Sequence, residues 1–333
     1  MGNRVLHARL RPGSLRFSWP DLFAWITVFV ARASLGCMTF AAANHVERPL
    51  VDRPLHDRPL QGLAAFVTGG GTGIGLACAQ RLARDGAAVT ICGRRADVLE
   101  SAASSLGAQG RMIVCDVTND EQVAAAVEFA AASLGRLDIA VANAGGASTA
   151  GPMVMADLNG WNQTIALNLI GTLSVIKHSA PLMARSGGGS IVALSSIAGH
   201  MTHRNLGAYA VAKAGVEMMV RNAADELGRF GIRVNGVRPG LVPTDISAGL
   251  NNDEATRQDY LNQMPLGRTG TVDDVASAVR FLAGPEASWI TGQLLGVDGG
   301  HSLRRGPDLG NLFDGAFEQP LRALMTNGAV PRD

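Results

Sequence analysis

Short apolar runs alternate with longer segments in which apolar residues recur at helical spacing, from about residue 63 to residue 297. A continuous apolar run of about four to eight residues is typical of a strand that is buried on both faces. Apolar residues that recur every three or four positions are typical of a helix that packs one face on a core. The pattern predicts strands at 64–67, 88–92, 112–115, 139–143, 190–194, 234–237 and 294–297, and helices at 74–84, 96–106, 121–134, 158–184, 208–227 and 272–282.

This alternation predicts an α/β protein with a single Rossmann-like, doubly wound parallel sheet and helices on both faces. A length of 333 residues allows one large α/β domain or two smaller ones. The alternation continues without a break, and the sequence contains no repeat of solenoid length. We therefore expect one domain over residues 61–300.

The first sixty residues have a different pattern. Four arginines precede an apolar run at 22–31 and three alanines follow at 41–43, an order that imitates a signal peptide. The apolar run is about ten residues long, whereas a membrane-spanning helix needs roughly 18. Arg-Pro-Leu then occurs three times between residues 48 and 60, where the prolines exclude a regular helix. We expect a weakly ordered extension and Pro-rich linker over 1–60, with no export and no stable membrane span; the alternative for residues 1–37 is an upstream extension before a natural start at Met38.

Residues 301–333 continue beyond the last expected strand. Pro307 and Gly310 discourage a continuous helix, yet the segment carries more apolar residues than a disordered tail usually does. These residues are Leu309, Leu312, Phe313, Phe317, Leu321 and Leu324. We expect this C-terminal tail either to pack over a neighbouring subunit or to fold back over its own pocket.

The composition excludes several classes of partner. Charged residues make up 17% of the chain and the formal net charge is +1, so no strong field favours nucleic acid or an anionic membrane. The four cysteines have no metal-like or paired spacing, which indicates reduced thiols and a cytoplasmic location. His200 and His203 are three residues apart in a loop without further Cys or acidic ligands, so we expect no metal and place both at the pocket rim or surface.

A glycine-rich sequence, “TGGGTGIG” at 68–75, joins the first expected strand to the first expected helix. Glycines let backbone amides approach a pyrophosphate closely, and the N-terminus of the following helix favours negative charge. Its spacing differs from the G-x-G-x-x-G of many dinucleotide-binding domains, but its place at the end of the first strand is the expected one. The candidate cofactor-binding residues here are Gly69, Thr72, Gly73, Ile74 and Gly75.

Tyr209 and Lys213 lie four positions apart in a predicted helix and therefore share one of its faces. A phenol with a pKa near 10 is a poor acid–base group at neutral pH unless a cation stabilises its anion. A Tyr and a Lys at this spacing are common on helices, so the pair alone does not establish catalysis.

The region from residue 60 to residue 300 resembles the short-chain dehydrogenase/reductase family. Eight motifs occur in the order found in that family: “TGGGTGIG” at 68–75, Asp116 with Val117, “NAG” at 143–145, “NLIGT” at 168–172, “SS” at 195–196, Tyr209-x-x-x-Lys213, “RPG” at 238–240 and “VDGG” at 297–300. The resemblance implies hydride transfer between a nicotinamide cofactor and a carbonyl or secondary alcohol. It also implies a homodimer or homotetramer.

A catalytic tetrad follows from the resemblance: Asn168, Ser196, Tyr209 and Lys213. Tyr209 is then the proton donor in reduction and the acceptor in oxidation. Lys213 lowers the pKa of Tyr209 and holds the nicotinamide ribose, Ser196 binds the substrate oxygen, and Asn168 positions a water in the proton relay. Ser196 matches the family serine by its separation of thirteen residues from Tyr209, and the adjacent Ser195 remains the alternative. For Asn168 the alternative is a polar residue that bends a long helix.

The sequence after the second expected strand bears on the choice of cofactor. A carboxylate there accepts hydrogen bonds from the adenosine ribose, whereas an arginine pairs with a 2′-phosphate. Gly93 occupies the position of the NAD-type carboxylate and is followed by Arg94 and Arg95, so NADP(H) is favoured over NAD(H). Thr72 departs from family members that carry a second basic residue in the glycine-rich loop, and the alternative for the arginines is two solvated cations.

The resemblance implies further cofactor contacts along the chain. They are Asp116 and Val117 at the adenine, Asn143, Ala144 and Gly145 along the cofactor, and Pro239, Gly240 and Thr244 near the carboxamide.

The substrate is a small molecule that the sequence does not identify. Three segments are expected to line its pocket, 146–155, 199–207 and 241–264, and the last is expected to be a lid. Their apolar residues favour a 3-oxoacyl, steroid-like or terpenoid compound; they are Met153, Val154, Met155, Leu206, Leu241, Ile246, Leu250, Leu261 and Met264.

Two alternative functions remain at this point. An enoyl-thioester reductase of the same fold would reduce a carbon–carbon double bond, and the Ser196–Tyr209 spacing favours carbonyl chemistry over it. A non-catalytic dinucleotide-binding protein would be favoured by loss of the tyrosine or the lysine, and both are present.

Overall fold

The computed structural model describes residues 58–304 and 309–327. The expectations for residues 1–57 lie outside the described residues. Among the described residues, the first that belongs to the core is Leu60, whose side chain is completely buried, one position before the expected start of the domain.

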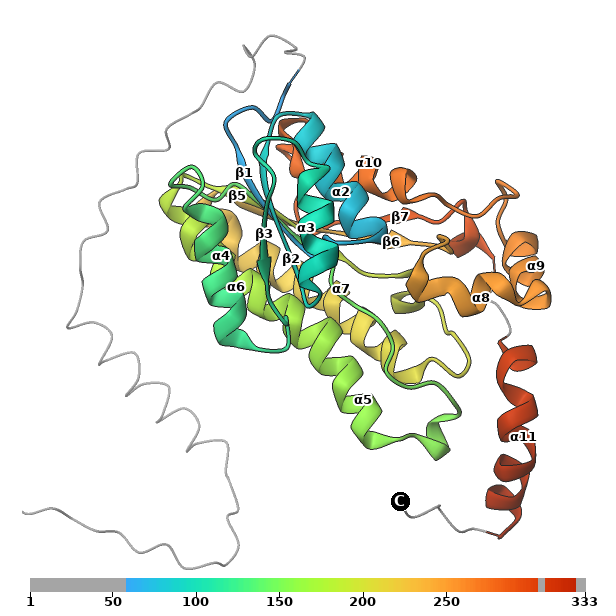
Figure 1. Cartoon of the computed structure of the whole chain (residues 1–333). Helices are drawn as coiled ribbons and strands as arrows, with labels where there is room; N and C mark the ends of the chain where they lie inside the picture. The colour runs from blue at the N-terminus through green and yellow to red at the C-terminus, as the bar shows by residue number, and fades with distance from the viewer. Residues whose placement is uncertain (1–57, 305–308, 328–333) are drawn as a thin grey trace, which may run out of the picture. The chain divides into compact units, whose positions relative to one another are not determined.

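Seven parallel strands form one sheet, with the order β3-β2-β1-β4-β5-β6-β7 (Figure 1). The strands are β1 (Ala64–Thr68), β2 (Ala88–Gly93), β3 (Arg111–Val114), β4 (Ile139–Ala142), β5 (Gly189–Leu194), β6 (Ile232–Pro239) and β7 (Leu294–Val297). The predicted parallel, doubly wound sheet is thus confirmed, and each expected strand is present within two residues of its expected ends.

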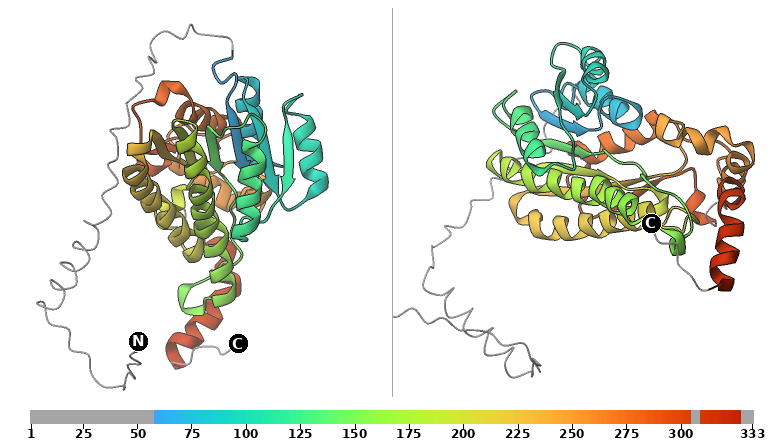
Figure 2. Two further views of the ribbon diagram at one scale, coloured as in Figure 1. Left: turned by 90° about the vertical axis from the view of Figure 1, so that its left-hand side faces the viewer. Right: turned by 60° about the horizontal axis from the view of Figure 1, so that its bottom comes forward.

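Helices cover both faces of the sheet, as the two views of Figure 2 show. One face carries α2 (Gly73–Arg84), α3 (Ala96–Ser104) and α10 (Val272–Ala283), and the other carries α4 (Asp120–Ala131), α6 (Gly171–Arg185) and α7 (Gly207–Leu227). Successive strand residues alternate between the two layers, since Val67 packs with the first group and Phe66 with the second. Both layers are apolar, which explains the continuous apolar runs in the sequence.

Side-chain caps fix where several helices begin. The Asn119 side chain accepts a hydrogen bond from the Gln122 amide at the start of α4. Thr271 and Asp274 form a capping box at the start of α10. Such caps satisfy amides that have no partner inside the helix.

The long helix expected at 158–184 is interrupted. It consists of α5 (Leu158–Ile165), a π-helical turn (Ala166–Ile170) and α6. Asn168 lies within the π-helical turn and is completely buried. The combined stretch Leu158–Arg185 is long and apolar enough by composition to cross a membrane, but α6 packs on β4 and β5 as a core helix, so this is weak evidence for a span.

The C-terminal tail contains a helix that the sequence analysis did not predict, α11 (Gly310–Asn327). It begins at Gly310, so this glycine does not prevent a helix, and Pro307 lies outside the described residues. The apolar residues of the tail recur every three or four positions from Leu309 onward, and this spacing could have predicted the helix. Two short helices, α8 (Ala248–Asn252) and α9 (Glu254–Gln263), occupy the expected lid segment.

Candidate active site

A cleft of about 1050 Å³ opens at the carboxyl ends of the strands. After β1 the chain builds the sheet toward β3, and it then returns to place β4 on the other side of β1. Ligands of doubly wound sheets bind at such a reversal of strand order, where the loops diverge and leave a crevice. The cleft therefore lies where the fold itself favours a ligand.

Nearly all the predicted site residues line this cleft. They come from α7 and from the segments at the ends of six strands, β1 to β6, and they are Gly69, Thr72, Gly73, Ile74, Gly75, Arg94, Arg95, Asp116, Val117, Asn143, Ala144, Gly145, Ser196, Tyr209, Lys213, Pro239, Gly240 and Thr244. Asn168 is the exception, because it lies one layer behind the cleft wall.

The glycine-rich loop has a backbone that other residues cannot adopt without strain. Gly69 and Gly73 have positive φ angles of 63° and 55°. A side chain at Gly75 would overlap the backbone of Gly69, so the first turn of α2 approaches the loop as closely as backbone allows. The N-cap residue Thr72 makes no side-chain cap, which leaves first-turn amides directed at the cleft. Such a cradle fits a dinucleotide pyrophosphate.

Thr68 and Asn143 hold this cradle in place. The Thr68 hydroxyl accepts hydrogen bonds from the amides of Asn143 and Ala144, both at 3.0 Å. The Asn143 side chain donates to the carbonyl oxygen of Thr68 at 2.9 Å. These contacts join the loop after β1 to the loop after β4, so the two sides of the crevice have a fixed separation.

Arg94 and Arg95 are exposed at the end of β2, beside the glycine-rich loop. Within residues 58–304 and 309–327, neither guanidinium forms an ion pair with a carboxylate. The Asp116 carboxylate, at the expected adenine site, accepts hydrogen bonds from the amide and the hydroxyl of Thr118 at 2.9 and 2.8 Å. Two cations thus remain available to an anionic ligand.

Tyr209 and Lys213 are on one face of α7, as their spacing predicts, and both reach the cleft. The Lys213 ammonium lies 5.6 Å from the centroid of the Tyr209 ring and donates a hydrogen bond of 2.7 Å to the carbonyl oxygen of Leu194. Burial lowers the pKa of Lys213 to about 8. Burial also raises the pKa of the Tyr209 phenol, while a hydrogen bond with Ser196 lowers it in part.

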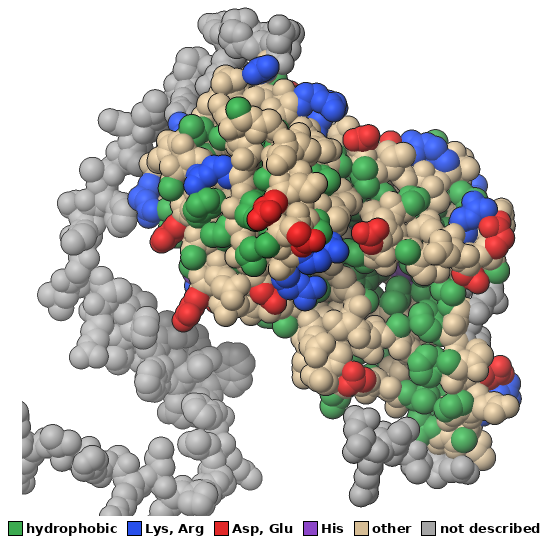
Figure 3. Space-filling model, in the orientation of Figure 1, with side chains coloured by type: hydrophobic (Ala, Val, Ile, Leu, Met, Phe, Trp, Pro, Cys, Tyr) green, Lys and Arg blue, Asp and Glu red, His purple; other side chains and the backbone are tan. Residues whose placement is uncertain are grey.

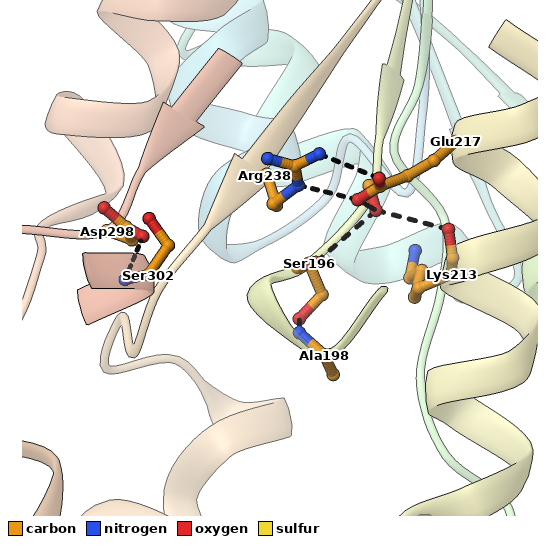
Figure 4. A network of polar contacts seen from close by, with 8 residues as sticks. Ser196, Ala198, Lys213, Glu217, Arg238, Asp298 and Ser302 are labelled. Atoms are coloured by element: carbon orange, nitrogen blue, oxygen red, sulfur yellow. Dashed lines mark hydrogen bonds and ion pairs between the residues drawn. The ribbon is translucent and has the colours of Figure 1, made fainter. Parts of the chain in front are cut away.

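The two candidate serines have different surroundings (Figure 4). The Ser195 hydroxyl is buried and donates to Glu217 at 3.1 Å, and it also lies 3.3 Å from the Lys213 carbonyl oxygen and 3.5 Å from the Ser196 carbonyl oxygen. The Ser196 oxygen accepts a hydrogen bond from the Ala198 amide at 3.2 Å, which leaves its O–H able to donate. Ser196 is therefore the serine that can offer a hydrogen bond beside Tyr209.

Asn168 supports the cleft from behind. Its side-chain oxygen accepts from the Gly146 amide at 3.1 Å, and its nitrogen donates to the carbonyl oxygens of Gly146 and Thr164 at 2.6 and 2.8 Å. A side chain at Gly145 would lie 2.6 Å from the Asn168 oxygen and 3.1 Å from the Lys213 nitrogen. The π-helical turn thus brings Asn168 against the loop that faces Lys213.

The substrate end of the cleft is mostly apolar. Of the expected pocket residues, the cleft is lined by Leu206, Leu241, Ile246 and Leu250. The other expected residues lie elsewhere: Met153 and Val154 are exposed, Met155 lines a separate small pocket, Leu261 is outside the lining and Met264 is buried behind it.

Several residues of the lining were not predicted as site residues, among them His203, Tyr260, Leu312 and Phe313. His203, expected at the rim or surface, is buried, whereas His200 is exposed. Tyr260 on α9 and Leu312 and Phe313 on α11 also line the cleft. Tyr260 is the second of only two tyrosines in the sequence, and this rarity could have marked it as a candidate site residue.

Comparisons with known proteins agree on one family. Residues 69–302 match a family model described as enoyl-(acyl carrier protein) reductase. The chain is 40% identical over 240 residues to cis-4-hydroxycyclohexanecarboxylate dehydrogenase of Sinomonas cyclohexanicum, covering 72% of this chain and 96% of that one. It is 37% identical over 248 residues to 7alpha-hydroxysteroid dehydrogenase of Escherichia coli, covering 72% and 94%. A solved short-chain type dehydrogenase/reductase from Mycobacterium ulcerans is 44% identical, with a TM-score of 0.77 over 79% of this chain and 98% of that one.

Proposed function

Because this chain belongs to the short-chain dehydrogenase/reductase family, we propose that Ser196, Tyr209 and Lys213 carry out its reaction, with Asn168 supporting them. The chain is an NAD(P)-dependent oxidoreductase that acts on CH–OH and C=O groups. The observation that carries the residue assignment is the convergence of Ser196, Tyr209 and Lys213 at one end of a cleft whose other end is the glycine cradle.

The nicotinamide, when bound, supplies the hydride in reduction and accepts it in oxidation. Ser196 donates a hydrogen bond to the carbonyl oxygen and so orients the substrate. Tyr209 delivers its phenolic proton to that oxygen as negative charge develops there. Lys213 stabilises the resulting phenolate, and Asn168 holds the 145–146 loop against Lys213. In oxidation the phenolate takes the proton from the alcohol.

We propose an apolar, ring-bearing ketone or secondary alcohol as substrate. Two named relatives act, by their names, on a hydroxylated cyclohexane ring and on a hydroxysteroid. The aliphatic lining of this cleft suits a similar ring, because leucine side chains offer dispersion contacts and no charge. A panel of alicyclic ketones and alcohols, assayed with both cofactors, tests the assignment; turnover of linear enoyl thioesters alone would contradict it.

The enoyl reductase remains the weaker candidate. The matching family model carries that description, but two relatives reported above are named as dehydrogenases of a hydroxycyclohexanecarboxylate and a hydroxysteroid. Ser196 and Tyr209 both line the cleft, and a carbonyl oxygen can accept a hydrogen bond from each hydroxyl at once.

We propose NADP(H) as the preferred cofactor, because Gly93 stands where a carboxylate would exclude a 2′-phosphate, and Arg94 and Arg95 beside it can pair with that phosphate. We further propose residues 61–300 as the catalytic domain, a cytoplasmic location, and a homodimer or homotetramer. Every site residue named here lies beyond residue 60, which supports the proposed domain boundary.

A further inference from the structure

The first turn of α11 lines the substrate end of the cleft with Leu312 and Phe313. This turn lies outside residues 69–302, the part of the chain that the family model matches. We propose that the protein's own C-terminal segment, residues 309–317, forms the distal wall of the substrate pocket and selects substrates that carry apolar bulk away from the reacting carbon. The proposed class of substrate rests on the proposed function, whereas the inference that residues 309–317 form a wall of the pocket does not.

The segment is anchored to the pocket floor. Leu309 is completely buried in a cluster with Leu241, Tyr260 and Met264. Leu241 and Tyr260 themselves line the cleft, so the residues that hold the tail also face the ligand. Burial of this leucine side chain favours the docked position of the segment.

The second turn of α11 contacts another pocket segment. Phe317 packs on Gly151, where an added Cβ would lie 3.0 Å from the Phe317 ring. The Gly151 amide donates to the Asn205 carbonyl oxygen at 2.8 Å and so ties the 146–155 segment to the 199–207 segment. The rings of Phe313 and Phe317 are 6.4 Å apart. The tail thus contacts the 146–155 segment and shares an apolar cluster with the other two segments expected to surround the substrate.

The wall is apolar where it faces the cleft. Leu206, Leu250, Leu312 and Phe313 pack around the same cluster. Figure 3 shows hydrophobic side chains gathered along α11 and in the hollow beside it. Since apolar contact area sets affinity in such a pocket, a substrate with bulk at this end gains binding free energy that a small ketone does not.

A binding experiment tests the wall without any turnover. The protein is saturated with NADPH, and 1-anilinonaphthalene-8-sulfonate is titrated, because its emission rises in apolar surroundings. Phe313→Ala should weaken this binding about tenfold, the scale expected for a lost apolar pocket contact. Met325→Ala is the matched control, since Met325 is on the same helix but 71% exposed and should change the dissociation constant less than about twofold.

NADPH binding by each variant reports that it is folded, and Leu312→Ala is the second variant if Phe313→Ala does not fold. Equal probe affinity in wild type, Phe313→Ala and Leu312→Ala overturns the wall. A changed subunit number, measured by light scattering, together with unchanged probe affinity would also overturn the wall. The tail would then pack against a neighbouring copy instead of lining its own pocket.

A turnover experiment tests the substrate class. We expect Phe313→Ala to lower kcat/KM about tenfold for 4-tert-butylcyclohexanone and less than about twofold for cyclohexanone. An equal effect on both ketones contradicts the selection. If wild type reduces neither ketone while Phe313→Ala still weakens probe binding, the wall stands and the proposed function fails.

Discussion

Arg238 and Glu217 form a bidentate ion pair directly behind the reaction site (Figure 4). The Arg238 Nε and Nη2 atoms donate to the two Glu217 oxygens at 2.7 and 2.8 Å. Glu217 also accepts from Ser195, and it lies one helical turn beyond Lys213 on α7. The pair therefore ties the helix that carries Tyr209 and Lys213 to β6, the strand that leads to Pro239 and Gly240.

Removing one partner of this pair should destabilise the fold strongly. Glu217→Gln or Arg238→Met leaves a buried charge without its partner, which costs about 3–5 kcal/mol. The double variant Glu217→Leu with Arg238→Met should be less destabilised than either single variant, because no charge is then left uncompensated. Urea unfolding followed by circular dichroism measures all three. A double variant as unstable as the sum of the singles would show that the two charges act independently.

Replacing Tyr209 by Phe should lower the rate of ketone reduction by about 10²–10⁴-fold, the usual contribution of a general acid. The change removes one hydroxyl and little volume, so the dissociation constant for NADPH should stay within about twofold. Steady-state kinetics and fluorescence titration measure the two quantities. Near wild-type turnover in the variant would mean that another group supplies the proton.

Ketone reduction should decline as the pH rises through about 8. Burial lowers the pKa of Lys213 to about 8, so its ammonium loses the proton there rather than at 10.5, and Tyr209 loses the neighbouring cation. The initial rate between pH 6 and pH 10 measures this effect. A rate that stays constant to pH 10 would contradict it.

Unfolding does not account for that decline. Because the folded pKa of Lys213 is depressed, the unfolded chain binds more protons between pH 8 and 10.5. The cost of burying the charge is present below pH 8 and is relieved as the pH rises. This residue therefore adds stability over the range in which activity falls, and thermal unfolding measured at each pH separates the two effects.

The parts of the site that lie on regular elements could be predicted from the sequence. Tyr209 and Lys213 share a helix face because of their spacing, and Gly75 follows a buried strand. The position of Asn168 was harder to predict from the sequence, because a π-helical turn arises from packing and has no clear periodic signal. The roles of Tyr260 and Phe313 depend on how α9 and α11 fold back over the cleft, and contacts between distant segments leave no local pattern.

The choice of cofactor should depend on Arg94. Its guanidinium is exposed beside the cleft and can pair with a 2′-phosphate, which NADPH has and NADH lacks. A hydrogen-bonded charged group contributes about 1.5–3 kcal/mol, so Arg94→Ala should weaken NADPH binding about 10- to 100-fold and leave NADH binding nearly unchanged. Arg257→Ala is the control, because Arg257 pairs with Glu254 on α9 and is not part of the cleft lining. Fluorescence titration with NADPH and with NADH measures the dissociation constant of each variant for both cofactors. Tighter binding of NADH than of NADPH by the wild type would show that these arginines are solvated cations without a ligand role.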